Sequence, residues 1–307
     1  MTYQIYEMLR QGRISGDEIG RRLSISRAAV NKHIKKLRAT GVNMLSTSGI
    51  GYEWINDGLI NEYSLKYEFK KYGLSNGIIC KPTTSTNRDA KELALTEARD
   101  MLIVAPYQSK GRGRLSREFE SAIGGAYFTL IINGKGIPVA LSMRVVLIVG
   151  LAVNDMLADY GINGLLKWPN DVFVEGKKIT GILMELITEG AETSKIIIGI
   201  GINIINKLSD NLSKIATNMK DYTAKPLNIA EIIGNVSKRI YNYIEQLKNG
   251  HWEDIKSKYL MKSYNINKNV LCNGVTGIAK GITEEGFLII DVNGEDNRII
   301  TGDVNIC

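Results

Sequence analysis

The sequence predicts an α+β protein of several domains, and three observations lead to this class. A basic N-terminal segment carries helix caps and the apolar spacing of short helices. Strand-like and helix-like segments alternate through the long middle part, and short strand-like runs separated by Gly-containing turns fill the C-terminal part. With 307 residues, 44% of them hydrophobic and 23% charged, the chain has the composition and length of two or three globular domains.

The N-terminal segment predicts two short helices and a third, basic helix. The first helix has a buried face of three apolar residues at i, i+3 and i+4, namely Ile5, Met8 and Leu9. It ends at Gly12. The run Ser15-Gly16-Asp17-Glu18 predicts a capping box that opens a second helix, which extends through Leu23. After a tight turn at residues 24–25, Ser26 is a suitable N-cap for a third helix at 27–39.

This order of helices is typical of a helix-turn-helix, and residues 44–54, which bend at Gly49-Ile50-Gly51, predict a two-stranded wing. Residues 1–56 hold nine lysines and arginines but only four acids, a balance that suits DNA. We therefore expect residues 1–58 to form a winged helix-turn-helix that binds DNA. The expected DNA contacts lie on the third helix: Ser26, Arg27, Asn31, Lys32 and Lys35. A three-helix domain with a solvated basic face is the alternative.

The middle part predicts a mixed α/β domain over residues 59–265, after an Asn-Asp-Gly linker at 56–58. Strands are expected at residues 78–80, 101–107, 126–132, 165–168, 171–174, 178–186 and 196–204. Helices are expected at residues 85–95, 138–160 and 228–247. Residues 266–307 have turns at Asn273-Gly274, Glu285-Gly286 and Asn293-Gly294, which predict a small β-barrel.

Four segments of the middle part have residues suited to ligand binding. A loop at 108–117, Gln-Ser-Lys-Gly-Arg-Gly-Arg-Leu-Ser-Arg, combines cations with glycines and suits a carboxylate or phosphate ligand. Lys-Trp-Pro-Asn-Asp at 167–171 presents an amide beside a carboxylate, and Lys178 begins a buried strand. Gly-Ile-Gly-Ile-Asn at 199–203 ends another strand. Taken singly, each of these is also explained as a solvated loop, a plain turn, an exposed lysine or close packing.

Several classes of function are excluded by composition. His33 and His251 are the only histidines, which excludes a Ser-His-Asp triad and a His-rich metal site. The three cysteines have no metal or disulfide spacing, as in a reducing compartment. The N-terminus lacks the apolar core of a signal peptide, and the run Val145–Val153 is too short to span a bilayer. We expect a cytoplasmic protein that does not bind membranes.

In this order and spacing, the segments resemble the biotin–protein ligases, and the N-terminal domain resembles the branch that also represses the biotin operon. The matching motifs are Ser85-Thr86-Asn87, Gly-Arg-Gly-Arg at 111–114, Lys-Trp-Pro-Asn-Asp at 167–171, Lys-x-x-Gly-Ile-Leu at 178–183 and Gly-x-Gly-x-Asn at 199–203. The resemblance covers essentially the whole chain. It implies a biotin/lipoate ligase-like central domain and an SH3-like β-barrel at the C-terminus. Phe119 departs from the family, where tryptophan is usual, and puts adenine stacking in question.

The resemblance implies ATP-dependent formation of biotinyl-5′-AMP, followed by transfer of biotin to a carrier lysine. Its implied catalytic residues are Lys178, Arg114 and Arg112. Its implied biotin-binding residues are Ser85, Thr86, Asn87, Gln108, Gly111, Arg112, Gly113, Arg114, Lys178, Gly181, Leu183 and Gly199. Arg117, Asn170, Asp171 and Asn203 are implied for ATP. No dedicated metal site is expected, and Mg²⁺ is expected to enter with ATP near Asp171.

The implied partners are the biotin carboxyl carrier domain of acetyl-CoA carboxylase and operator DNA, with dimerisation promoted by the bound ligand. Two alternatives remain open. A biotin-responsive regulator without ligase activity has less reason to keep Arg112, Arg114 and Lys178 together. A lipoate or octanoate ligase shares the central fold, but the Lys-Trp-Pro-Asn-Asp and Gly-Arg-Gly-Arg elements favour biotin.

Overall fold

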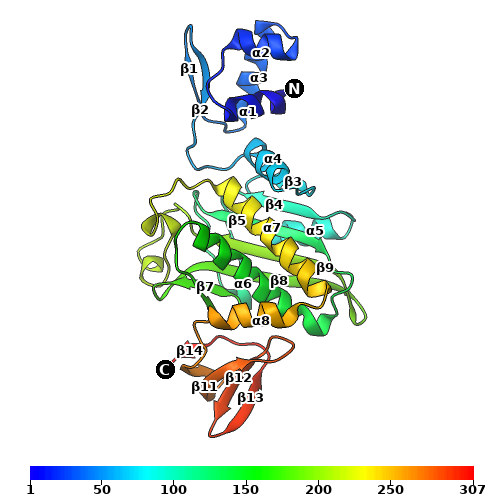
Figure 1. The fold of residues 1–307 in the computed structure, drawn as a ribbon, viewed down its shortest axis with the longest axis vertical. Coiled ribbons are helices and arrows are strands. Elements are labelled where there is room, and N and C mark those ends of the chain that lie inside the picture. Colours follow the sequence, from blue (N-terminus) through cyan, green and yellow to red (C-terminus); the bar gives the residue numbers. More distant parts are fainter.

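The computed structural model describes residues 1–307, apart from the side chain of Ser116, as three parts arranged along one long axis (Figure 1). The N-terminal helices and hairpin lie at one end of this axis. A large sheet covered by helices lies in the middle. A small group of strands that includes the C-terminus lies at the other end.

The N-terminal part confirms the predicted helix-turn-helix. It contains α1 (Thr2–Arg10), α2 (Gly16–Leu23) and α3 (Arg27–Ala39), followed by the hairpin of β1 (Met44–Thr47) and β2 (Gly51–Trp54). Tyr6 joins Ile5 and Leu9 on the buried face of α1, and the predicted Met8 is partly buried against the same core. The side chains of Val30, Ile34 and Leu37 bury the inner face of α3.

Both predicted serine caps are present, but the capping box is only half formed. The Ser15 Oγ accepts a hydrogen bond from the Glu18 backbone N at 3.1 Å, and the Ser26 Oγ accepts one from the Ala29 N at 3.2 Å. The return bond from the Glu18 side chain is absent among the described contacts. The Glu18 carboxylate instead pairs with Arg21 and Arg22 within α2.

The middle part is built on a seven-stranded sheet in the order β3-β4-β5-β9-β8-β7-β6. Its strands are β3 (Gly77–Cys80), β4 (Met101–Ala105), β5 (Ala126–Asn133), β6 (Leu165–Lys167), β7 (Asp171–Val174), β8 (Lys177–Glu189) and β9 (Glu192–Ile202). Only the β3–β4 pair is parallel. Every predicted strand of this part is found. The strand expected to reach residue 107 ends at Ala105, because Pro106 has no N–H for the ladder.

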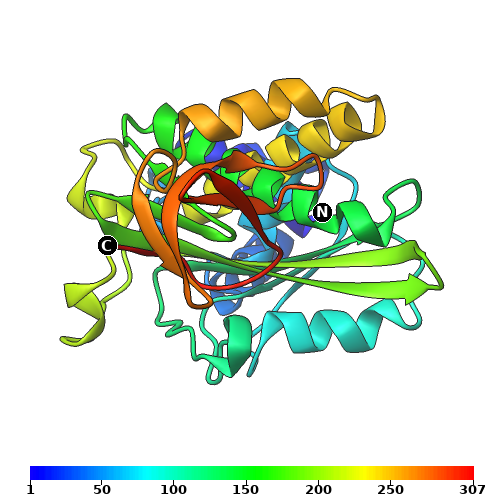
Figure 2. The same cartoon turned by 90° about the horizontal axis from the view of Figure 1, so that it is seen from below.

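Helices cover both faces of this sheet (Figure 2). On one face lie α6 (Ser142–Asp159) and α7 (Ile229–Lys248), with α8 (Trp252–Met261) packed on them. On the other face lies α5 (Thr86–Ala94). The predicted helix at 138–160 begins as a short 3-10 turn, Val139–Leu141, before α6. The stretch Val139–Asp159 is long and apolar enough to cross a membrane, but it is mostly buried within the fold, as the core helix of a soluble protein is.

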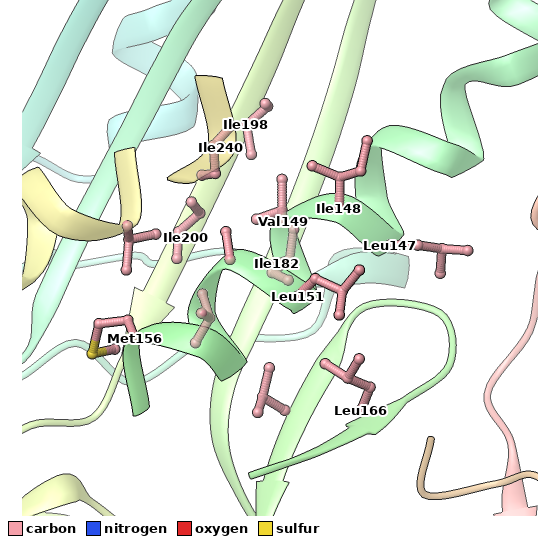
Figure 3. Close-up of a cluster of buried hydrophobic side chains, with 14 of the residues drawn as sticks. Leu147, Ile148, Val149, Leu151, Met156, Leu166, Ile182, Ile198, Ile200 and Ile240 are labelled. Atoms are coloured by element: carbon pink, nitrogen blue, oxygen red, sulfur yellow. The ribbon is translucent and has the colours of Figure 1, made fainter. Parts of the chain in front are cut away.

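The main hydrophobic core lies between the sheet and helices α6 and α7. Figure 3 shows side chains from the sheet and from these helices in this core: Val149, Ile182, Ile198, Ile200 and Ile240. Alternate residues of a strand point to opposite faces of the sheet. Since Ile182, Ile198 and Ile200 point into the core, positions 181, 183, 199 and 201 face the side that carries α5.

Two helices were not predicted from the sequence, α4 (Glu62–Lys71) and α8. In α4 the capping box uses Asn61 and Ser64, and a serine at the third helical position does not match the usual Glu or Gln signal. The helix α4 packs on α7 of the middle part and also contacts α1 of the N-terminal part.

The C-terminal part confirms the predicted β-rich end. Its strands are β10 (Asn269–Cys272), β11 (Val275–Ile282), β12 (Leu288–Val292), β13 (Glu295–Ile299) and β14 (Asn305–Ile306), in the order β13-β12-β11-β10-β14. The predicted turns contain Gly274, Gly286 and Gly294, all with positive φ. Figure 2 shows this sheet strongly curved, but among the described strands no pairing between β13 and β14 closes it into a barrel.

Leu151 provides a test of the core beneath the sheet. Its side chain is 1% exposed within the main hydrophobic core, so Leu151→Ala should lower the free energy of unfolding by about 2–5 kcal/mol. Leu95→Ala removes the same atoms from a leucine that is 76% exposed, and should change it by no more than about 0.5 kcal/mol. Urea denaturation followed by tryptophan fluorescence measures both, and equal effects would contradict this packing.

Candidate active site

A cavity of about 320 Å³ lies on the face of the sheet that carries α5. Its walls come from the start of α5, the loop that follows β4, the strands β7, β8 and β9, and the C-terminal part. The cavity gathers every biotin and ATP residue expected from the sequence except Gly111: Ser85, Thr86, Asn87, Gln108, Arg112, Gly113, Arg114, Arg117, Asn170, Asp171, Lys178, Gly181, Leu183, Gly199 and Asn203.

Three glycines make the floor of the cavity flat. Gly181 of β8 pairs with Gly201 of β9, and Gly199 lies two residues along the same strand and on the same face. A Cβ atom at Gly199 would overlap the side-chain amide of Asn87, and one at Gly201 would overlap the Phe119 ring. The absence of these Cβ atoms therefore lets Asn87 and Phe119 lie directly on the sheet.

One end of the cavity is lined by uncharged hydrogen-bonding side chains, and the Glu185 carboxylate, which is outside the lining, accepts a hydrogen bond from the Asn87 Nδ2 at 3.1 Å. The Thr86 backbone N donates to the Gln108 Oε1 at 2.8 Å, and the Gln108 Nε2 donates to the Ser121 Oγ at 2.9 Å. The Asn87 Nδ2 donates to the Leu183 carbonyl at 3.1 Å. Ser85 precedes α5 as its N-cap residue, but its hydroxyl makes no capping bond. Such groups suit a neutral polar ligand such as a ureido ring.

Thr129 of β5 holds this network together. Its Oγ1 lies 2.7 Å from the Asn87 Oδ1 and 2.8 Å from the Thr86 Oγ1, and the residue is fully buried. The sequence analysis missed Thr129, because a threonine within an apolar strand run carries no signal beyond its preference for strands.

The arginine loop forms the second wall. The Arg114 Nη1 donates to the Asn170 Oδ1 at 3.0 Å, and its Nη2 donates to the Thr301 Oγ1 at 2.7 Å. The Arg117 Nη2 forms an ion pair with the Asp303 Oδ2 at 2.6 Å. The C-terminal part thus holds the loop through two of its arginines. Asp303 lines the cavity and was not among the expected site residues, because only the fold brings it there.

Gly111 supports the loop from behind. A Cβ at this position would overlap the Phe119 carbonyl and approach the Ser121 hydroxyl, so only glycine fits. The predicted contact of Gly111 with the ligand is not supported by the lining of the cavity, which begins at Arg112 on this side of the loop.

Lys178 and Asp171 face each other across the β7–β8 hairpin. The Lys178 Nζ lies 2.6 Å from the Asp171 Oδ1, and both side chains are partly buried. The neighbouring Asn170 donates from its Nδ2 to the Ile182 carbonyl at 2.7 Å, which fixes its amide beside Arg114. Burial lowers the pKa of Lys167, which stands at the start of the same turn.

Trp168 anchors this turn to the C-terminal part. Its ring is 1% exposed, and the indole Nε1 donates to the Gly286 carbonyl at 3.0 Å. Its backbone N donates to the Asn265 Oδ1 at 2.8 Å, and the Trp168–Pro169 peptide bond is cis. The position of Asn170 and Asp171 therefore depends on contacts from two parts of the chain.

The remaining wall is apolar and comes from a loop that the sequence analysis assigned no role: Leu212, Ile215 and Ala216. Asn203 lies at the end of β9 on this side, and its Oδ1 accepts from the Asn206 Nδ2 at 3.1 Å. The cavity thus combines a neutral polar end, a cationic middle and an apolar wall. This combination suits a ligand with an uncharged polar ring, an anionic group and a planar base.

The chemistry available to the cavity is stabilisation of negative charge. Arg112, Arg114, Arg117 and Lys178 all line it, and such fixed cations stabilise charge that develops on phosphoryl or carboxylate oxygens. Among the described residues, no group of three or more His, Cys, Asp or Glu side chains could hold a metal ion.

The N-terminal domain presents the expected DNA contacts on one face of α3. Arg27, Asn31, Lys32 and Lys35 are exposed, and the Tyr52 hydroxyl of the wing donates to the Asn31 Oδ1 at 2.6 Å. Ser26, also predicted as a DNA contact, uses its hydroxyl as the N-cap of α3.

Comparisons with known proteins agree with this geometry. Residues 78–203 match the Biotin/lipoate A/B protein ligase family, and residues 2–53 match an HTH domain. The bifunctional ligase/repressor BirA of Bacillus subtilis is 31% identical over 95% of this chain and 94% of its own length. The Escherichia coli protein of the same description is 26% identical over 95% of this chain and 92% of its own length.

The fold is also that of a solved ligase. The biotin protein ligase from Aquifex aeolicus, solved in complex with biotin and ATP, superposes with a TM-score of 0.66 and 30% identity. The match covers 76% of this chain and 99% of that one. Because the Bacillus subtilis relative is 31% identical over 94% of its own length, the chain belongs to the bifunctional ligase/repressor family of biotin protein ligases.

Proposed function

We propose that this protein joins biotin to a lysine of a biotin carboxyl carrier domain at the expense of ATP, and represses biotin operon genes through its N-terminal domain. One observation carries the enzymatic part of this proposal. The polar end, the arginine loop and the Lys178–Asp171 pair line a single cavity, and together they provide partners for a biotin ring, its carboxylate and a nucleotide.

The reaction has two steps. An oxygen of the biotin carboxylate attacks the α-phosphorus of ATP, the bond to pyrophosphate breaks, and biotinyl-5′-AMP forms. The ε-amine of the carrier lysine then attacks the acyl carbon, loses a proton and releases AMP. Because the first step brings two anions together, it needs fixed cations more than an acid–base pair, and this suits a site without histidine.

The residues divide between the ligands as follows. Ser85, Thr86, Asn87 and Gln108 bind the ureido ring, together with backbone groups near Gly113, Gly181, Leu183 and Gly199. Lys178 holds the carboxylate and stabilises charge on the phosphoryl oxygens, while Arg112 and Arg114 cover the carboxylate and the adenylate phosphate. Arg117 meets the ATP phosphates, and Asn170 and Asn203 bind the nucleotide.

Mg²⁺ enters bound to the phosphates of ATP, where it neutralises part of their charge. Asp171, the first residue of β7, is a carboxylate in the lining of the cavity, and it is paired with Lys178. We assign Asp171 one of two roles: it assists the Mg²⁺ ion bound to ATP, or it receives the incoming amine of the carrier lysine. Phe119, which lies on the glycine floor, supplies an aromatic face for the adenine ring.

We divide the chain into a DNA-binding domain at 1–58, a catalytic domain at 59–265 and an SH3-like module at 266–307. The SH3-like module holds the arginine loop through Thr301 and Asp303. The protein works in the cytoplasm, acts on the carrier domain of acetyl-CoA carboxylase, and dimerises when the adenylate is bound. A dimer presents two α3 helices to the two half-sites of an operator.

The reaction is tested by transfer of labelled biotin to a purified biotin carboxyl carrier domain, with ATP and Mg²⁺ present and lipoate as competitor. We expect transfer that requires ATP and that lipoate does not reduce. Biotin binding without transfer would instead support a regulator without ligase activity. Inhibition by lipoate, with transfer of lipoate itself, would support a lipoate ligase.

Lys178 and its neighbour Lys177 form a matched pair for mutation. Lys178→Ala should lower the rate of adenylate formation by about 100-fold or more, because a fixed cation at the reacting centre is lost. Lys177→Ala should have little effect, since its ammonium bonds the Ser213 carbonyl on the exposed side of the hairpin. Pyrophosphate release measures both rates. Normal adenylate formation by Lys178→Ala, with operator binding retained, would contradict the assigned role.

Lys35 tests the DNA-binding face. The probe is a duplex that the protein itself enriches from a random-sequence library in the presence of biotin and ATP. Lys35→Ala should weaken binding and reduce the slope of log affinity against log salt by about 1 per protomer, because one phosphate contact is lost. Lys66→Ala, on the exposed side of α4, should leave the slope unchanged. An unchanged slope for Lys35→Ala would place the DNA on another face.

A further inference from the structure

A buried ion pair joins the DNA-binding domain to the catalytic domain. Arg10 is the last residue of α1, and Glu68 lies in α4, 58 residues further along the chain. The Arg10 Nη2 donates to the Glu68 Oε1 at 2.9 Å. The Glu68 side chain is 0% exposed and that of Arg10 is 12% exposed, so water hardly reaches the pair.

Arg10 also stacks on aromatic rings from both sides of the junction. Its guanidinium carbon lies 4.1 Å from the centroid of the Trp54 ring, at the end of the wing, and 4.7 Å from that of Tyr67 in α4. A planar guanidinium held between two rings and one carboxylate has a defined orientation as well as a defined position. Arg10 therefore ties α1, the wing and α4 into one geometry.

The helix α4 belongs to two hydrophobic cores at once. Tyr63 and Tyr67 pack with Tyr6 in the core of the N-terminal domain, with ring centroids 5.9 Å and 6.2 Å from that of Tyr6. Leu65 and Phe69, on another side of the helix, lie in the main core beneath the seven-stranded sheet. The helix is thus part of the catalytic domain and also forms the surface on which the DNA-binding domain sits.

The charges around Glu68 make its orientation specific. Burial raises the pKa of Glu68, while Arg10 and Lys71 favour its charged form. The Lys71 Nζ lies 3.6 Å from the Glu68 Oε2 and 3.1 Å from the Glu231 Oε1 of α7. A rotation of the DNA-binding domain would separate the Arg10 guanidinium from Glu68 and leave Lys71 as the cation beside that carboxylate, so the pair favours one orientation of the domain.

We infer that the Arg10–Glu68 pair positions the DNA-binding domain on the catalytic domain, so that the two α3 helices of a dimer reach half-sites at one fixed spacing. The inference rests on the proposed binding of DNA by a dimer. Without the pair, the linker at residues 55–61 and the packing of Tyr6 on Tyr63 and Tyr67 still join the two domains, but the buried contact that sets the angle between them is lost. A looser junction lets the two DNA-binding domains of a dimer adapt to half-sites at several spacings.

The experiment measures affinity for a series of duplexes. The starting duplex is the one enriched from a random library, and variants carry insertions of 1–10 base pairs between its half-sites. For the unaltered protein we expect affinity to fall at least about 10-fold when about 5 base pairs are inserted, because half a turn moves one half-site to the opposite face. Affinity should partly recover at about 10.

Arg10→Ala and Glu68→Gln should bind the best duplex more weakly and flatten this profile to within about threefold, while biotin transfer stays within about twofold of the unaltered protein. Lys70→Ala is the matched control, because it breaks the exposed Lys70–Glu7 pair across the same junction and should keep the full spacing preference. A flattened profile is a change that general loss of stability does not produce.

The outcomes separate the two proposals. If the affinity of the unaltered protein does not depend on the half-site spacing, the proposal that a dimer binds the DNA is contradicted. If it shows a sharp preference that both variants retain, the positioning role of Arg10 and Glu68 is overturned. Should Glu68→Gln lose biotin transfer through misfolding of the catalytic domain, Arg10→Ala decides, because its side chain belongs to the other domain.

Discussion

The site depends on a floor without side chains at the centre of the sheet. Gly181, Gly199 and Gly201 share one face of β8 and β9, and the opposite face of the same strands carries the isoleucines of the main core. One pair of strands therefore supplies both the packing that fixes the fold and the space into which Asn87 and Phe119 descend. The cavity has a flat floor because the core on the opposite face of the sheet holds β8 and β9 in place.

The cationic wall depends on the opposite end of the chain. Arg114 and Arg117 are held by Thr301 and Asp303, and Trp168 donates to Gly286, so the C-terminal strands buttress both the arginine loop and the turn that carries Asp171. Arginines in a glycine-containing loop lose much conformational entropy on binding a ligand. Contacts that hold the loop before the ligand arrives reduce that cost.

The sequence predicted features that depend on neighbouring residues better than features that depend on residues far apart in the chain. Local signals succeeded: Ser26 caps α3, the turns at Gly274, Gly286 and Gly294 have positive φ, and apolar runs marked the strands. The motifs located most of the cavity lining. Thr129, Asp303 and the buried Glu68 escaped notice, because each acts through a partner more than forty residues away that only the fold brings near. The helix α4 was missed because its capping box uses serine.

The placement of α4 explains how the DNA-binding and ligase domains are joined without a flexible connection. This helix follows the linker directly, and it gives its tyrosines to one core and its leucine and phenylalanine to the other. Shortly after it, β3 leads to Ser85-Thr86-Asn87, the polar end of the cavity. The DNA-binding domain therefore rests on the segment that leads into the ligand site. A rearrangement of that segment on ligand binding would reach α1, and through it α3, by way of the packed tyrosines and the Arg10–Glu68 pair.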